Sequence, residues 1–327
     1  MRIWAVSDGR AGIENQALGL AEAIARRVRA EITTKRIHLR TPWSWLHPGF
    51  IPAPKQALAI GSDAIDPPYP DIFIGCGRAS IPFAMGMREW SNHRTLVVQL
   101  QDPRVNPREF DIVAPPFHDA LGGPNVVPIV GACHRVTPQR IAEEAGPLRD
   151  QLLAEQRPIY AVLIGGKSKR QTITARRARL MSDALARVKH ASGGTLAVTL
   201  SRRTPQPARA AFAAHLAPHA ALFYDPADGA GANPYFALLS AADAIFVTAD
   251  SVNMATEAAA TGKPIHVMPV DGGGGKLAAF HQSLEERGAA RPFRLPLTSW
   301  AYTPLLETDR VAQAVLMALQ ARRQKAR

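Results

Sequence analysis

Two basic runs follow apolar segments that have the length of a buried β-strand. They consist of Gly165, Gly166, Lys167, Ser168, Lys169 and Arg170 in the first run and Ser201, Arg202 and Arg203 in the second. Glycines let a ligand approach the backbone, and cationic side chains bind phosphate oxygens. A Walker loop is excluded, because its first glycine would fall on Ala161 inside the expected strand. The runs therefore predict a diphosphate site rather than ordinary solvated charge.

A further candidate site lies in the segment 243–265. Its pattern predicts a buried strand, a turn, a helix capped near Ser251 and a new strand. Asn253 and Glu257 lie four residues apart and share a face of that helix. A carboxylate there can accept both hydroxyls of a ribose, and the free amides before it can bind a diphosphate. The alternative is that Glu257 is buried and a neighbouring strand end satisfies its hydrogen bonds. Alanines surround Glu257 in the sequence, so an unpaired carboxyl there would be costly and a specific partner is expected.

Two aspartates follow expected strands in the first half of the chain. Asp8 lies in a glycine-containing turn between a strand and a helix, and Asp102 follows the strand 95–99. The turn is not GxGxxG, so a dinucleotide fingerprint is absent. Turn shape alone would explain its glycines, but Asp8 beside Arg10 favours an acceptor-side or catalytic loop. Polar residues at the carboxyl end of a buried strand are typical of ligand sites, so Asp102 is the second candidate.

Three more segments carry candidates with simpler alternatives. Gly75–Arg78 closes a strand, and turn shape explains it equally well. The four glycines 272–275 predict a flexible loop and a candidate lid. His281 and Glu285, four residues apart on a helix, are either an acid/base pair or a solvated helix face.

The elements that must position these residues alternate between strand and helix. The expected strands are 2–7, 31–37, 71–75, 95–99, 110–114 and 126–130, then 159–164, 195–200, 221–224, 244–247 and 265–268. Connections long enough to hold a helix imply parallel pairing. The sequence therefore predicts an α/β fold of two Rossmann-like domains whose strands point their carboxyl ends into an interdomain cleft.

Length and composition support two domains. A chain of 327 residues exceeds the usual limit of one hydrophobic core, and 46% apolar residues suffice for two. We expect an N-terminal domain over 1–150, completed by a C-terminal helix over 305–327, and a second domain over 151–304. The proline- and tryptophan-containing stretch 42–54 predicts a packed surface excursion.

Charge and cysteine usage restrict the environment and the partners. With two cysteines and no CxxC, neither a disulfide framework nor a structural zinc site is expected. No long apolar run or signal peptide is visible, which predicts a soluble cytoplasmic chain that starts at Met1. The net charge of +12 is dispersed, so no nucleic acid is expected. An anionic membrane surface could attract the tail residues Arg322, Arg323, Lys325 and Arg327, although a solvated helix end explains them as well.

Taken together, these segments resemble the bacterial relatives of the plant elongated-mitochondria protein, a mitochondrial-fission family of suspected glycosyltransferases. The resemblance covers nearly the full length. It rests on SDGRAGIENQALGLAEA (7–23), LQDPR (100–104), IGGKSKR (164–170), LSRRTP (200–205), NPYFALLSAADAIFVTADSVNMATEA (233–258) and TGKPIHVMP (261–269). It implies a fold of glycosyltransferase-B (GT-B) type with donor binding in the second domain. The helix 251–257 matches the donor helix whose glutamate holds the ribose.

The resemblance and the residues together predict transfer of a sugar from a nucleoside-diphosphate donor to an envelope or lipid-linked acceptor. Asp8 and Asp102 are the candidate catalytic residues. The candidate donor-binding residues are Gly165, Gly166, Lys167, Arg170, Ser201, Arg202, Arg203, Asn233, Tyr235, Ser251, Asn253, Met254 and Glu257. No metal and no cofactor other than the sugar nucleotide is expected.

Two alternatives belong to other classes. One is a non-catalytic scaffold that kept the fold and binds a membrane or a protein. The other is a sugar-nucleotide epimerase or another NAD enzyme, which the missing GxGxxG disfavours. For a transferase or a scaffold alike, we expect a cytoplasmic location, either free or peripheral on the inner face of the membrane.

Overall fold

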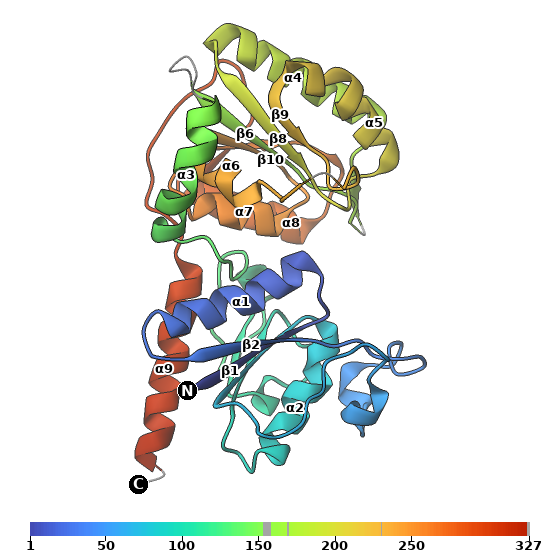
Figure 1. Cartoon of the computed structure of the whole chain (residues 1–327), viewed down its shortest axis with the longest axis vertical. Coiled ribbons are helices and arrows are strands. Elements are labelled where there is room, and N and C mark those ends of the chain that lie inside the picture. The colour runs from blue at the N-terminus through green and yellow to red at the C-terminus, as the bar shows by residue number, and fades with distance from the viewer. Residues whose placement is uncertain (153–157, 169, 230, 326–327) are drawn as a thin grey trace. The chain divides into compact units, whose positions relative to one another are not determined.

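The computed structural model describes residues 1–152, 158–168, 170–229 and 231–325 in two compact units (Figure 1). The first unit comprises Met1–Arg135 with Leu306–Arg327, and the second comprises Val136–Leu305. The boundary lies at Val136 and not at 151, because α3 (Pro138–Leu152) packs against α6 (Tyr235–Ala241). Arg149 on α3 donates a hydrogen bond of 2.7 Å to the Ala241 carbonyl, which anchors this helix in the second unit.

The first unit is built on a parallel sheet of five strands in the order β2-β1-β3-β4-β5. Its strands are β1 (Arg2–Ser7), β2 (Glu31–Arg36), β3 (Ile72–Cys76), β4 (Leu96–Leu100) and β5 (Ile112–Ala114). The strand expected over 126–130 was wrong. That segment contributes only isolated bridges from Val126 to Val113 and from Ile129 to Pro116, since prolines 115, 116 and 128 lack the amide that a ladder needs.

Helices cover both faces of this sheet. The helices α1 (Ala11–Ala25) and α9 (Glu307–Lys325) lie on one face and α2 (Ile81–Trp90) on the other (Figure 1). Side chains alternate along each strand, so Ile3 packs toward α1 and α9 whereas Trp4 packs toward α2. The C-terminal helix thus completes the core of the first unit.

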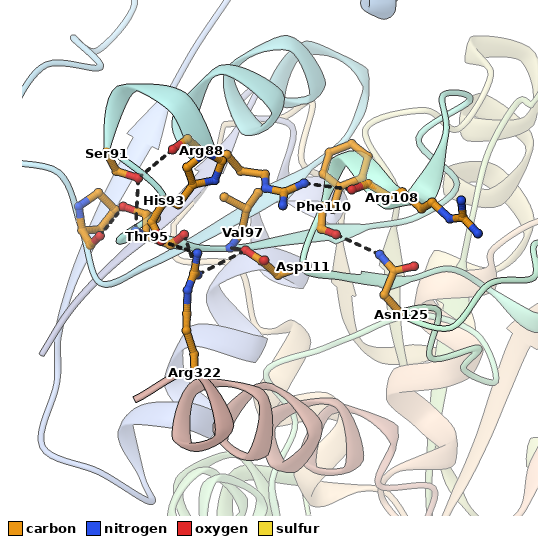
Figure 2. Close-up of polar contacts among 11 residues, drawn as sticks. Arg88, Ser91, His93, Thr95, Val97, Arg108, Phe110, Asp111, Asn125 and Arg322 are labelled. Carbon is orange, nitrogen blue, oxygen red and sulfur yellow. Dashed lines mark hydrogen bonds and ion pairs between the residues drawn. The ribbon is translucent and has the colours of Figure 1, made fainter. Parts of the chain in front are cut away.

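One arginine fastens the end of α9 to the sheet. Arg322 donates a hydrogen bond of 3.0 Å to the carbonyl of Thr95 and another to that of His93 (Figure 2). Its guanidinium also lies 3.5 Å from the Asp111 carboxylate, which accepts a hydrogen bond from the Val97 amide. Arg322 therefore holds the end of α9 to the first unit and is not a free cation of the tail.

The second unit is built on a parallel sheet of six strands in the order β13-β11-β10-β6-β8-β9. Its strands are β6 (Ile159–Ile164), β8 (Thr195–Leu200), β9 (Ala220–Tyr224), β10 (Ala244–Thr248), β11 (Ile265–Met268) and β13 (Ala290–Pro292). Read from β9 to β13, this is the Rossmann order, with β6 as the first strand and β10 as the fourth. Sequence reasoning missed β13 and a small ladder between β7 (Gln171–Thr172) and β12 (Asp271–Gly272).

Two layers of helices enclose this second sheet. The helices α4 (Ala175–Ser192) and α5 (Gln206–His215) lie on one face, and α6, α7 (Val252–Ala259) and α8 (Gly275–Glu286) on the other (Figure 1). No helix in the described ranges has both the length and the apolar character that a membrane span requires.

The strand order fixes where a ligand can bind in each unit. In doubly wound folds, ligands bind at the carboxyl ends of the strands where the order reverses. That point lies between β1 and β3 in the first unit and between β6 and β10 in the second. That these two edges face one another across a cleft stays a prediction.

Candidate functional site

Three loops meet at the switch point of the second unit. The Gly165 amide donates to Thr248 Oγ1 at 2.7 Å, and the Gly166 amide donates to Asp250 Oδ2 at 2.6 Å. On the other side, the Lys167 amide donates to the Arg203 carbonyl at 2.9 Å. The loops after β6, β8 and β10 therefore lie together at one edge of the sheet.

Packing explains why residues 165 and 166 are glycines. A Cβ atom on Gly165 would lie 2.2 Å from Asp250 Oδ2, and one on Gly166 would lie 2.2 Å from the Arg203 carbonyl carbon. Real Cβ atoms essentially never come this close to another heavy atom. Both glycines are therefore required for the contact between the loops, whether or not a ligand approaches them.

Four cations surround this contact. Lys167, Arg170, Arg202 and Arg203 are all exposed. None of them forms a salt bridge among the described residues, and Lys169 between them lies outside those residues. Unpaired cations at a strand-end edge can bind the oxygens of a diphosphate.

Sequence reasoning missed the residue that supports the β8-end loop. Arg209 on α5 donates hydrogen bonds to the carbonyls of Ser201 at 3.2 Å and Thr204 at 3.4 Å. The same guanidinium pairs with Asp225, and both side chains are buried. Pro207 and the alanines around Arg209 gave no signal that this one arginine turns inward.

Tyr235 and Glu257 form a buried pair. The Tyr235 hydroxyl at the start of α6 donates a hydrogen bond of 2.5 Å to Glu257 Oε2 on α7. Burial raises the pKa of Glu257 to about 7, which the hydrogen bond from Tyr235 opposes. Burial also raises the pKa of Tyr235 well above its usual value. The sequence prediction that Glu257 needs a specific partner is correct, but that partner is a tyrosine hydroxyl and not a strand end.

The other predicted donor residues lie at the first turns of the same two helices. Ser251 caps α7, since its hydroxyl accepts from the Met254 amide at 3.4 Å. Asn253 and Met254 follow in the first turn and are half-buried. Asn233 Oδ1 accepts from the Tyr235 amide at 3.1 Å and so fixes the entry to α6.

A buried aspartate and a half-buried histidine also lie at this edge. The aspartate was absent from the predicted set, and a solvated helix face was one of the two explanations offered for the histidine. Asp250 accepts from Gly166, its Oδ1 has no partner among the described residues, and burial raises its pKa. His281 on α8 binds the Ala249 carbonyl through Nε2 at 2.8 Å, and burial lowers its pKa. His281 is therefore neither on a solvated face nor paired with Glu285.

The glycine run after β11 is partly ordered. Gly272 pairs in the β7–β12 ladder, and the Gly273 amide donates to the Arg170 carbonyl at 3.2 Å. Asp271 accepts from Thr174 at 2.7 Å and pairs with Arg177 at 3.0 Å. Gly274 caps α8 and Gly275 begins it, so the four glycines do not form the flexible loop that the sequence suggested as a lid.

The switch point of the first unit has a hollow of about 220 Å³ beside it. The hollow lies where β3 and β4 end. It is lined by His47, Pro48, Gly77, Arg78, Ile81, Gln99, Leu100, Gln101, Asp102, Pro103 and Arg104. Gln101 and Arg104 adopt positive φ angles of 69° and 57°, a strained conformation for such residues that often marks a functional loop.

Asp8 and Asp102 adopt the same turn at two strand ends. Each carboxylate accepts from the amide two residues later, at 3.2 Å for Asp8 and 2.9 Å for Asp102. Each also binds the guanidinium of that later residue, with Arg10 Nη2 2.6 Å from Asp8 and Arg104 Nε 2.8 Å from Asp102. Asp102 lines the hollow, and Asp8 lies beside Gly77 at its edge.

The described residues contain no cluster of three or more histidine, cysteine or acidic side chains that could hold a metal ion. Both sites instead consist of carboxylates, guanidinium groups and backbone amides at strand ends. Such groups can bind a phosphorylated ligand and move a proton.

Comparisons with known proteins agree with this architecture. The sequence model of the family described as Mitochondrial fission ELM1 matches residues 11–319. The mitochondrial fission protein ELM1 of Arabidopsis thaliana is 32% identical over an alignment of 279 positions, which covers 77% of this chain and 65% of the Arabidopsis protein. The chain therefore spans just under two thirds of that relative. An uncharacterized protein of Rickettsia prowazekii is 28% identical over 98% of this chain and 99% of its own length.

A solved structure supports the fold. The UDP-GlcNAc 2-epimerase from Methanocaldococcus jannaschii aligns with 97% of this chain and 100% of its own, at a TM-score of 0.56 and 12% identity. The expected α/β fold with two Rossmann-like domains, each built on a parallel sheet, is thus confirmed.

Proposed function

The chain belongs to the Mitochondrial fission ELM1 family, and from this premise we propose that it is a glycosyltransferase. The donor is a nucleoside-diphosphate sugar, and the acceptor is an envelope or lipid-linked saccharide. The observation that carries the proposal is the edge of the second sheet, where four cations without salt bridges accompany a buried carboxylate on the neighbouring helix.

The donor binds at the β6/β10 switch point. Lys167, Arg202 and Arg203 take the charge of the diphosphate, together with Arg170 from the end of the same loop. Glu257 accepts the hydroxyls of the ribose, which replace the Tyr235 hydroxyl that now occupies one of its oxygens. The tyrosine thus holds the carboxylate in place until the ribose arrives.

Transfer needs a leaving group that is stabilised and an acceptor that is activated. The acceptor oxygen forms a bond to the anomeric carbon while the bond from that carbon to the diphosphate breaks. Preorganised cations stabilise the departing diphosphate, so no covalent nucleophile is required. The acceptor proton passes to Asp8 or Asp102, once that carboxylate has moved away from its arginine.

Isothermal titration with UDP, GDP and dTDP sugars tests the donor site. We expect one nucleotide to bind the wild-type chain, and the Arg202→Ala/Arg203→Ala variant to bind it at least about tenfold more weakly. Arg179→Ala/Arg187→Ala, which removes two exposed arginines from α4 of the same unit, is the matched control and should bind normally. The absence of heat with every donor would contradict the proposal.

A scaffold function is the second candidate, and the ion pairs of Asp8 and Asp102 favour it. In the structure, each candidate base forms a salt bridge with the arginine two residues later and is not presented to an acceptor as a free side chain. Glu257→Ala separates the two candidates. A transferase loses donor affinity in this variant, whereas a scaffold that binds no donor shows no heat before or after the substitution.

A further inference from the structure

The loop between β2 and β3 exposes large apolar side chains. We call residues 41–60 the tryptophan loop. Trp45 is 76% exposed, Phe50 75%, Ile60 fully exposed and Leu46 41%. Single exposed apolar residues are common on protein surfaces, but four in one loop are not explained by that background.

The loop presents these side chains from a fixed base. Pro48, Ile51 and Ala57 are buried, and the loop packs against α2 beside it (Figure 1). The Arg78 guanidinium donates to the Ser44 carbonyl at 3.0 Å and to the Leu46 carbonyl at 2.5 Å, on either side of Trp45. The exposure of Trp45 is therefore imposed by the fold, at a cost in solvation that a burying partner would offset.

Charge identifies the kind of partner. The sequence from Ile32 to Ser62 contains no aspartate or glutamate, while it carries Lys35, Arg36, Arg40 and Lys55. Arg36 pairs with Glu14 and Lys55 with Asp66. Arg40 is exposed, and its guanidinium has no hydrogen-bond or ion-pair partner among the described residues. Tryptophan and phenylalanine beside an unpaired arginine suit the boundary between lipid headgroups and acyl chains, where aromatic rings are enriched and anionic lipid attracts cations.

We propose that the tryptophan loop docks the first unit on an anionic phospholipid bilayer, with Trp45 and Phe50 inserted at the headgroup level and Arg40 on the lipid phosphates. The base of the loop, at His47 and Pro48, forms one wall of the hollow that contains Asp102. A docked bilayer would bring its headgroups beside this hollow. A lipid-linked acceptor there rests on the proposed function, whereas docking itself does not.

The C-terminal tail is a weaker anchor than this loop. Arg322 is engaged by the carbonyls of His93 and Thr95 and by Asp111 (Figure 2). Beyond Arg322, the described part of α9 contains one further arginine, Arg323, which is exposed. The tail also lacks aromatic side chains.

Vesicle co-sedimentation of the full chain, without any sugar nucleotide, tests the proposal. We expect binding to phosphatidylcholine vesicles that contain phosphatidylglycerol and much weaker binding to phosphatidylcholine alone. Trp45→Ala/Phe50→Ala should weaken binding at least about tenfold, since two apolar rings no longer enter the interface. Arg40→Gln should weaken binding to the anionic vesicles about fivefold.

The matched control is Leu180→Ala/Met317→Ala, which removes two exposed apolar side chains elsewhere and should bind as the wild type does. Brominated lipids give an independent readout, because they should quench a part of the tryptophan fluorescence that is missing in Trp45→Ala. Three results would overturn the proposal: no binding to either vesicle, equal binding by the Trp45→Ala/Phe50→Ala variant, or self-association of the wild type that this variant abolishes. The last would assign the loop to a second copy of the chain. Because no donor is present, a failure of the proposed transferase activity leaves this outcome unaffected.

Discussion

Burial of the Glu257 carboxyl makes the stability of the second unit sensitive to pH. The folded carboxyl keeps its proton up to a pKa of about 7, whereas an unfolded glutamate loses it near 4.5. Unfolding therefore releases a proton between these values, and the free energy of unfolding falls as the pH rises from 4.5 to about 7. The loss is complete above pH 7 and is on the order of 3 kcal/mol.

We predict that Glu257→Gln removes this part of the pH dependence. Glutamine cannot titrate, so urea unfolding of the variant should vary less between pH 4.5 and 7 than that of the wild type. Tyr235→Phe is the companion variant. It removes a hydrogen bond that lowers the pKa of Glu257, so the fall in stability should extend to higher pH. Identical pH profiles for the wild type and Glu257→Gln would show that the carboxyl titrates normally in the folded chain.

Gly166 offers a second prediction at this scale. A methyl group at 166 would collide with the Arg203 backbone, which cannot rotate away as a side chain can. Gly166→Ala should lower the free energy of unfolding by roughly 1–3 kcal/mol and separate the loops that hold the donor cations. Gly273→Ala is the matched control, because open space surrounds that position and its φ is ordinary. Chemical unfolding of both variants gives the comparison, and equal stability would mean that the loop shifts without cost.

At the scale of elements, α5 holds the β8-end loop through one buried ion pair. Arg209→Ala should lower the free energy of unfolding by about 3–5 kcal/mol, because Asp225 would stay buried without its partner. Arg209→Met/Asp225→Leu should recover most of this loss, since it removes both charges and keeps the volume.

The same pair of variants separates stability from positioning. Even with its stability restored, Arg209→Met/Asp225→Leu leaves the carbonyls of Ser201 and Thr204 without their donor. We therefore expect this double variant to bind the donor more weakly than the wild type does, as measured by isothermal titration with the sugar nucleotide. Wild-type affinity in this variant would show that the β8-end loop holds its shape without α5.

Sequence patterns predicted most of the elements because buried parallel strands are short, apolar and bounded by turn residues. The strands 159–164, 195–200 and 265–268 were predicted with their observed ends, and the predicted strands 221–224 and 244–247 each miss one residue at one end. Strand β13, three residues long, and the two-residue β7 and β12 carry no periodic signal. The prediction of a strand at 126–130 was wrong because it rested on apolar residues alone. The prolines in and opposite this segment lack the amide hydrogens that a continuous ladder of hydrogen bonds needs.

The site was predictable only as far as chain neighbours determine it. Glycines, cations and polar residues after strands are visible in the sequence, so the loops at 165–170 and 201–203 could be proposed as a site, and the structure places them at one edge of the sheet. Partners that come from distant elements were not visible, such as Tyr235 for Glu257 and Arg209 for the Ser201 loop. Asp250 was overlooked because its role depends on the close approach of Gly165, which only the packed sheet reveals.

At the scale of the whole molecule, the C-terminal helix α9 belongs to the core of the first unit, so that unit depends on both ends of the chain. Val311, Ala312, Val315 and Leu319 on α9 are buried in the core of the first unit. Thr308 Oγ1 accepts from the His134 amide at 2.9 Å, and Arg27 pairs with Asp309 at 2.6 Å. The second unit has its own core and takes no residue beyond Leu305.

Truncation after Leu305 should therefore unfold the first unit and leave the second folded. Burial of Val311, Val315 and Leu319 contributes about 1.5–3 kcal/mol each, and together they approach the whole stability of a typical domain. We expect calorimetry to show the loss of one unfolding transition while titration still detects nucleotide binding. Arg322→Ala keeps the helix and its apolar face, so it should lower only the first unit's transition. If truncation abolished both transitions, the second unit would depend on the first for its folding, contrary to its separate core.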